Sequence, residues 1–250
     1  MSKKSAELSR AERARAEIER QQAADRRRNW VVGGIVALLV VVVVVVGFVL
    51  TSSNDQTGKT AAAVPGGLSS DWTVTLGDPG APTTVTIYED PQCPICAQFE
   101  AMSSDALEKA VEDGRVKVDY RIVSFLDTHS QNEYSSRAAN ALMVVNEASG
   151  SEVFKAYHDL LYQRQPAEDT AGPSNSTLID WAVEAGADRA AVTPGIEDDV
   201  YQQYVIDAAD QMSKEGITGT PTIMIDGEIV GRGNPQEALQ ILLAKLKEGQ

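Results

Sequence analysis

The chain has 250 residues, of which 43% are hydrophobic, so it holds enough apolar material for a sizeable core and is not a disordered polyelectrolyte. It carries 36 acidic and 22 basic side chains, and this acidic balance argues against nucleic acid as a main partner. Two cysteines are too few for a disulfide-dense scaffold or for a zinc site with four thiolate ligands.

The first fifty residues divide into a charged tail and an apolar span. Residues 1–29 hold nine basic and five acidic side chains, whereas residues 31–50 hold no charge at all. A helix of this apolar length, rising about 1.5 Å per residue, matches the roughly 30 Å hydrocarbon core of a bilayer. Trp30 suits the water boundary, and Arg26 to Arg28 orient the tail toward the cytoplasm by the positive-inside rule.

We therefore predict a single transmembrane helix over 30–50, with everything after it extracytoplasmic. A cleaved signal peptide is the competing interpretation, but the charged leader and the apolar run are both longer than such peptides usually have. Residues 51–70 are rich in Ser, Thr, Gly and Ala and contain Pro65-Gly66-Gly67, which predicts a flexible tether to a domain over 71–250.

The domain begins with strand patterns around a pair of cysteines. Residues 83–88 are mostly β-branched and predict a strand, and residues 116–123 alternate apolar and polar side chains, which predicts another. Between them, Cys93-Pro94-Ile95-Cys96 leads into a helix-permissive stretch over 97–112. The order is thus strand, Cys-x-x-Cys at a helix start, strand.

The second half is predicted to be helical from about residue 130 to 216, with breaks over 165–176 and around Pro194-Gly195. A stripe with the helical period runs from Ile196 to Met212, including Val200, and is predicted to be core. Strands over 222–225 and 228–230 flank a tight turn at Asp226-Gly227. A last helix has Asn234 as its cap and Pro235 at its first position, and Gly249 is its predicted stop. These elements predict an α/β fold: a mixed sheet with a helical insertion.

Both cysteines fall in one Cys-x-x-Cys motif, which leaves three interpretations. Zinc would need two further ligands, and the only histidines, His129 and His158, have no zinc-like spacing. A purely structural disulfide across two residues would constrain the unfolded chain little. Redox chemistry is the interpretation that we favour, because an exported chain meets conditions in which disulfides form.

Thiol–disulfide exchange needs a thiolate, and a helix N-terminus stabilises negative charge through its unpaired N–H groups. We therefore expect Cys93 to be the exposed attacking sulfur, with a pKa below that of a free thiol. Cys96, one turn further into the helix, is expected to be the resolving cysteine. Pro94 fits the first helical turn, where no N–H is needed.

The segments Tyr88-Glu89-Asp90-Pro91-Gln92-Cys93-Pro94-Ile95-Cys96 and Gly216-Ile217-Thr218-Gly219-Thr220-Pro221-Thr222 resemble those of the DsbA-like thiol:disulfide oxidoreductases of bacterial envelopes. These proteins belong to the thioredoxin superfamily, and the resemblance covers roughly residues 71–248. It implies a thioredoxin fold with a helical insertion at about 128–195. It also implies that Pro221 is cis and faces the sulfurs, and that Thr220 offers backbone hydrogen bonds to a bound peptide.

The chain departs from this family at two places. Strongly oxidising members carry a histidine between the cysteines, where this chain has Ile95. The acidic residue that some relatives bury beneath the site has no match, since Ile87 takes its position and Glu89 and Asp90 lie in a different register. His129 and His158 are expected on a surface loop and a helix face, outside the chemistry.

The resemblance implies a membrane-anchored oxidase that donates the Cys93–Cys96 disulfide to cysteine-containing exported proteins and is reoxidised by a quinone-linked membrane partner. The anchor at 31–50 would contact the lipid bilayer, and no cofactor or metal is expected. The same motifs would also serve an envelope reductase or isomerase. A third hypothesis is a tethered chaperone that only binds peptide.

Overall fold

The computed structural model describes residues 72–231 and 234–247. The predicted cytoplasmic tail (1–29), transmembrane helix (30–50), tether (51–70) and helix stop at Gly249 lie outside these residues. Among the helices of the described ranges, none is long and apolar enough to cross a membrane.

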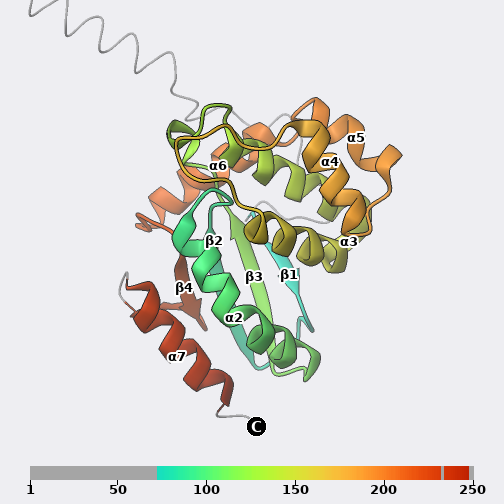
Figure 1. Cartoon of the computed structure of the whole chain (residues 1–250). Helices are drawn as coiled ribbons and strands as arrows, with labels where there is room; N and C mark the ends of the chain where they lie inside the picture. The colour runs from blue at the N-terminus through green and yellow to red at the C-terminus, as the bar shows by residue number, and fades with distance from the viewer. Residues whose placement is uncertain (1–71, 232–233, 248–250) are drawn as a thin grey trace, which may run out of the picture. The chain divides into compact units, whose positions relative to one another are not determined.

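The described chain contains a five-stranded mixed sheet with the order β1-β3-β2-β4-β5 (Figure 1). Its strands are β1 Val74–Leu76, β2 Thr83–Glu89, β3 Val116–Ile122, β4 Thr222–Ile225 and β5 Glu228–Ile229. The central pair, β2 and β3, is parallel, and the other pairings are antiparallel. The predicted strands are confirmed, and Asp226 and Gly227 take the positive φ angles of 52° and 86° expected for the turn. β1 was not predicted, because three residues are too few for a period to show.

Helices cover both faces of the sheet. α2 (Pro94–Glu112) and α7 (Pro235–Lys247) pack against each other in front of the sheet in Figure 1, and the main core includes side chains of both. Since side chains alternate along a strand, Ile87 joins this core whereas Tyr88 points to the other face. There Tyr88 packs in a smaller cluster with Ala208 and Met212 of α6 (Gln202–Lys214).

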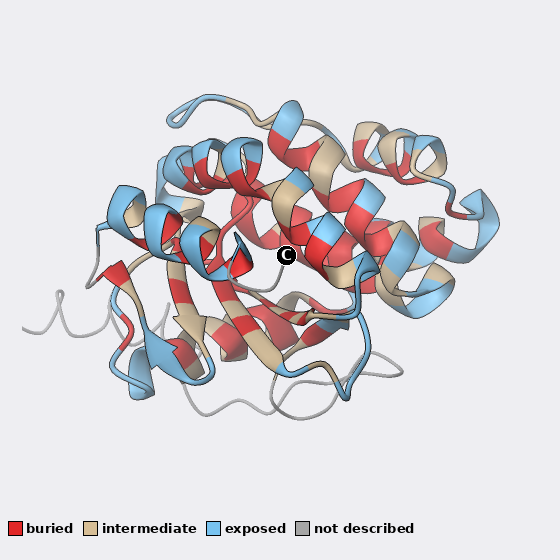
Figure 2. Cartoon of the chain, turned by 90° about the horizontal axis from the view of Figure 1, so that it is seen from below, coloured by how far each residue is buried: buried red, intermediate tan, exposed pale blue. Residues whose placement is uncertain are grey.

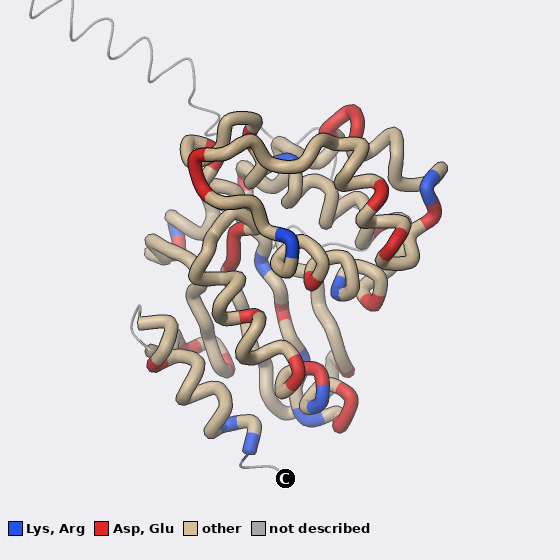
Figure 3. Tube along the Cα trace, viewed as in Figure 1, with Lys and Arg blue, Asp and Glu red and all other residues tan. Residues whose placement is uncertain are grey.

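Helices occupy the stretch between β3 and β4, as predicted: α3 (Tyr134–Gln163), α4 (Asn175–Glu184), α5 (Arg189–Glu197) and α6, preceded by the short 3₁₀ turn η1 (Asp127–His129). α3 is interrupted at Gly150, whose φ of 81° and ψ of 177° are not helical. Figure 2 shows buried residues on the inner sides of these helices and exposed residues on their outer sides. In Figure 3, Lys and Arg positions are scattered among more numerous acidic ones.

The break predicted at Pro194-Gly195 is wrong. Both residues lie inside α5, and the chain turns only after Glu197. Gly195 serves close packing instead, because a Cβ atom there would meet the Val144 side chain at 2.8 Å. The stripe beginning at Ile196 is therefore split between two helices, and Val200, in the turn between them, is 41% exposed rather than core.

Candidate active site

The two cysteines lie where the chain passes from the end of β2 into α2. Cys93 is the N-cap residue of α2 and Pro94 begins the helix, as predicted. Both thiols are free. The expectation that Cys93 is exposed is wrong, because its exposed fraction is only 6%, while Cys96 is fully buried. Tyr162 of α3 belongs to the same buried cluster as the two cysteines.

Cys93 carries the more acidic thiol. Its pKa is lowered to about 6, chiefly by a hydrogen bond from Cys96, against the effect of burial. The backbone N–H groups of Cys96 and Ile95 lower it further. The direction predicted from the helix N-terminus is confirmed, but the neighbouring thiol contributes more than the backbone. The pKa of Cys96 is instead raised well above the ordinary thiol value, first by burial and then by its bond to Cys93.

The second predicted motif meets the first at Cys93. The peptide bond between Thr220 and Pro221 is cis, as the resemblance implied. Cys93 Sγ lies 3.5 Å from the carbonyl oxygen of Thr220 and donates to it. Pro221 is buried, whereas Pro94 and Ile95 are exposed beside the cysteines. The structure thus brings all six predicted site residues together.

Asp90 anchors the loop that precedes Cys93. Its carboxylate accepts hydrogen bonds from the backbone N–H groups of Gln92 (2.8 Å), Phe125 (3.0 Å) and Leu126 (3.1 Å), and from the hydroxyl of Ser135 on α3 (2.7 Å). Burial raises the pKa of Asp90 to about 6, and these bonds act in the opposite direction. Asp90 therefore joins the cysteine loop, the loop after β3 and the inserted helices.

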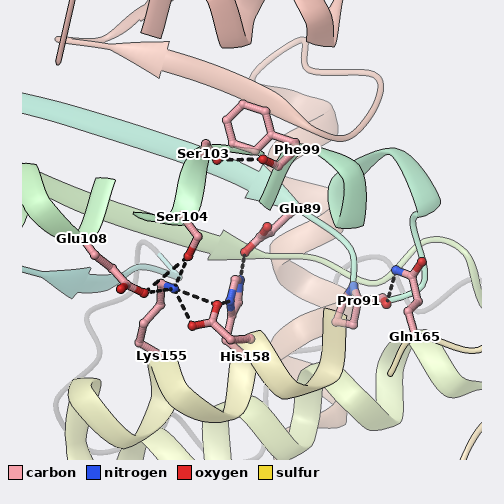
Figure 4. Close-up of polar contacts among 10 residues, drawn as sticks. Glu89, Pro91, Phe99, Ser103, Ser104, Glu108, Lys155, His158 and Gln165 are labelled. Atoms are coloured by element: carbon pink, nitrogen blue, oxygen red, sulfur yellow. Dashed lines mark hydrogen bonds and ion pairs between the residues drawn. The ribbon is translucent and has the colours of Figure 1, made fainter. Parts of the chain in front are cut away.

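Glu89 and His158 form an ion pair that is completely buried (Figure 4). His158 Nε2 lies 2.5 Å from Glu89 Oε1, and His158 Nδ1 lies 3.2 Å from Asp159 Oδ1. Burial disfavours the charged ring, but the charge of Glu89 and the bonds to both carboxylates prevail and raise the pKa of His158 to about 10. His158 is on a helix, as predicted, but is paired with the last residue of β2, four residues before Cys93. His129 lies on η1 with a 53% exposed side chain, as expected.

Ile87 is buried at the position where some relatives bury an acidic residue, but other acidic side chains that the sequence did not reveal as buried lie near the site. Besides Glu89, Glu100 is 3% exposed, and neither of its carboxyl oxygens has a hydrogen-bond partner. Burial, followed by the charge of Glu89, raises the pKa of Glu100 to about 8, so it is mostly protonated at neutral pH. Glu100 follows Cys96 by four residues on the buried face of α2, and this spacing is the signal in the sequence that would have found it.

Glu89, Glu100 and His158 are also the three residues of the described chain whose ligand atoms, all within 4.8 Å of one another, could hold a metal ion. In this structure, two of these ligand atoms, His158 Nε2 and Glu89 Oε1, are joined in the ion pair.

Gln165, just after α3, makes another contact with the cysteine loop that the sequence did not reveal. Its amide nitrogen donates to the carbonyl oxygen of Pro91 at 2.8 Å (Figure 4). It also donates to the carbonyl oxygen of Cys93 at 3.0 Å. A polar residue after a helix gives no local sign of such a long-range bond.

The fold and the cysteine geometry place the chain in a known class. Residues 69–245 match the family described as thioredoxin, and the chain belongs to this family. It is similar to reduced DsbA of Mycobacterium tuberculosis, with 31% identity over 71% of this chain and 91% of that one and a TM-score of 0.59. It is also similar to the disulfide bond oxidoreductase DsbG of the same organism, with 32% identity over 70% of this chain and 86% of that one and a TM-score of 0.60.

Two more distant comparisons add less. MdbA, a thiol-disulfide oxidoreductase from Corynebacterium diphtheriae, is 22% identical over 77% of this chain and 97% of its own, with a TM-score of 0.61, and supports the fold. The serine/threonine-protein kinase PknE of M. tuberculosis is 29% identical over 165 residues, which are 63% of this chain but only 29% of the kinase. The likeness to DsbA and DsbG supports thiol–disulfide exchange as the chemistry of this chain.

Proposed function

We propose that the chain is an extracytoplasmic oxidase that introduces disulfides into exported proteins through Cys93 and Cys96. The observation that carries this proposal is the place of Cys93 as N-cap of α2, where Cys96 and the backbone N–H groups of the first turn lower the pKa of its thiol to about 6. A stable thiolate on the reduced protein makes the disulfide readily reducible, which is the property of an oxidant.

The exchange follows from the different surroundings of the two sulfurs. A substrate thiolate attacks Cys93 Sγ, and the Cys93–Cys96 bond breaks as a substrate–Cys93 disulfide forms. Cys96 leaves with the electron pair and takes up a proton, because its raised pKa favours the thiol. The second substrate thiolate then attacks the substrate sulfur of this mixed disulfide. The substrate disulfide forms, the bond to Cys93 breaks, and Cys93 leaves as a thiolate. Two electrons have passed from the substrate to the chain.

The proposed location rests on the sequence. The apolar run over 31–50, with arginines before it, would anchor the chain and place the domain outside the cytoplasm. The partners would be cysteine-containing exported proteins and, for reoxidation, a quinone-linked membrane protein. A protease-protection assay on spheroplasts tests the topology: digestion of the cysteine domain only in permeabilised cells would refute it.

The reduction potential tests the direction of exchange. The 250-residue chain is equilibrated in glutathione buffers of defined ratio, and the oxidised fraction is read from alkylated thiols. A potential well above about −200 mV supports an oxidase, whereas one near thioredoxin's value of about −270 mV indicates a reductase.

A trapping experiment distinguishes exchange from peptide binding alone. Cys96→Ser is expected to accumulate mixed disulfides with exported proteins on Cys93, because the resolving thiol is missing. Cys93→Ser is the matched control and should trap none. A Cys93→Ser strain with normal disulfide formation would favour a non-catalytic chaperone.

A further inference from the structure

The charges beneath Cys96 come from three parts of the fold. Glu89 ends β2, Glu100 lies on α2, and His158 is carried by the inserted helix α3. Lys155 and Asp159, on α3, extend the cluster toward the surface: Lys155 Nζ lies 2.7 Å from Asp159 Oδ1 and 2.9 Å from Glu108 Oε1 (Figure 4). The negative charge of Glu89 is one of the causes that raise the pKa of Cys96, so the thiols respond to this cluster.

With the half-exposed Glu108 set aside, the charges of the cluster balance at neutral pH. Glu89 and Asp159 supply two negative charges, and Lys155 and His158 supply two positive ones. Glu100 is mostly protonated and adds little. Removing the imidazolium would leave a net negative charge in a region where burial keeps water from screening it.

Reduction of the disulfide creates a new negative charge in the same region. At pH 7 the disulfide takes up two electrons and one proton. The proton goes to Cys96, and Cys93 remains largely a thiolate because its pKa is about 6. Two glutathione molecules supply the electrons and become glutathione disulfide. Any unbalanced negative charge near the cysteines therefore opposes reduction.

We propose that His158 is a positioning residue of the redox centre: by balancing Glu89 beneath Cys96, it raises the reduction potential of the Cys93–Cys96 pair. The groups that face His158 from the elements packed around it are Glu89 (β2), Glu100 (α2), Tyr120 (β3) and, on α3 itself, Asp159 and Tyr162. Lys155 is one turn away on α3 and is engaged with Asp159 and Glu108, so His158 is the cation paired directly with Glu89.

The inference rests on the proposed exchange through Cys93 and Cys96 and is tested by differences between variants. In the 250-residue chain, His158→Gln keeps a hydrogen-bond donor near Glu89 but removes the charge. At pH 7 we expect the equilibrium constant for reduction by glutathione to fall about tenfold, the effect of one unit charge acting over roughly 12 Å in a medium of effective dielectric constant about 20. The alkylation profile of Cys93 should shift to higher pH in the same variant.

The double variant Glu89→Gln/His158→Gln separates charge from structure. It removes both members of the pair and restores the net charge, so the equilibrium constant should return most of the way to the original. His129→Gln, the same change at an exposed histidine, is the control and should have no effect. An unchanged potential in His158→Gln, or a double variant shifted as far as the single one, would overturn the inference.

A measurement on the unaltered chain covers the case in which His158→Gln does not fold. NMR titration of the imidazole nitrogens should show His158 protonated from pH 5 to 8 in both redox states. A neutral ring at pH 7 would remove the proposed cation and refute the idea. Stoichiometric Zn²⁺ binding at pH 7, lost in His158→Gln, would also refute it, since the metal would replace the ring proton. The direction of exchange is judged separately, from the absolute potential, so either proposal can fail alone.

Discussion

Cys96→Ala tests which interaction makes the Cys93 thiol acidic. The hydrogen bond from Cys96 is the first cause of the lowered pKa of about 6, and alanine removes this donor while leaving the start of α2 in place. We expect the pKa of Cys93 to rise toward the free-thiol value of about 8.5. At pH 7 the thiolate fraction would fall from about 90%, and a complete return to 8.5 would bring it to about 3%, so thirtyfold is the upper limit of the change in the reactive species.

The assay is thiolate absorbance at 240 nm against pH, supported by the rate of iodoacetamide alkylation. Cys96→Ser is the matched variant, because its hydroxyl retains a donor at the same position, and its Cys93 pKa should stay nearer to 6 than that of the alanine variant. An alanine variant that still titrates near 6 would refute the argument. The backbone N–H groups and the helix dipole would then be sufficient by themselves.

The same shift predicts how pH affects the stability of the reduced chain. The pKa of Cys93 is lower in the folded state than in the unfolded one, so between about 6 and 8.5 the unfolded state binds more protons and stability rises with pH. The contribution of Cys93 is therefore complete above about 8.5 and is lost as the pH falls through about 6. Urea unfolding of the reduced chain and of Cys93→Ala at pH 6 and pH 8.5 measures it. A stability difference between the two proteins that does not grow with pH would contradict this reasoning.

Three further substitutions test the surroundings of the cysteines. Asp90→Asn puts an amide NH₂ among N–H and O–H groups that donate to Asp90, so the free energy of unfolding in urea should fall by about 2–4 kcal/mol. A fall below about 1 kcal/mol, no larger than that of the exposed control Asp105→Asn, would argue against the anchoring role of Asp90. Gln165→Leu removes the N–H groups that donate to the carbonyls of Pro91 and Cys93, and the free energy of unfolding should fall by about 1–2 kcal/mol. An unchanged urea midpoint would show that these bonds contribute nothing to stability. Ile95→His places an imidazole at a 37% exposed position beside Cys93 and should raise the reduction potential of the cysteine pair. The rise should be larger at pH 5.5 than at pH 8, because the ring is charged below about pH 6.5, and an equal rise at both pH values would count against a charge mechanism.

Local signals in the sequence were sufficient to predict several strands, turns and helix starts of the fold. The β-branched run at 83–88 predicts β2, and Asp226-Gly227 predicts the turn between β4 and β5. Asn234 and Pro235 predict the start of α7, where the Asn234 side chain accepts from the backbone N–H groups of Gln236 and Glu237. Each of these signals acts within a few residues of the structure that it specifies.

Signals that depend on a distant partner were misinterpreted. Pro194-Gly195 has the composition of a turn, but Gly195 lies in a helix that packs closely on Val144. His158 gives no sign of its role, because its partner Glu89 is 69 residues away and belongs to the sheet. The positions of Glu89 and Asp90 along the strand show which way their side chains point. They do not show whether a distant residue pairs with the carboxylate and so allows it to be buried.

The inserted helices supply those partners, so they are part of the candidate active site rather than an appendage to it. In the five residues that end at Cys93, Glu89 is bonded by His158, Asp90 by Ser135, and the carbonyls of Pro91 and Cys93 by Gln165. All three partners lie on α3 or directly after it. Without that helix, two carboxylates would either be exposed to water or remain buried without a partner, which is costly. The insertion thereby determines which charges surround the thiols.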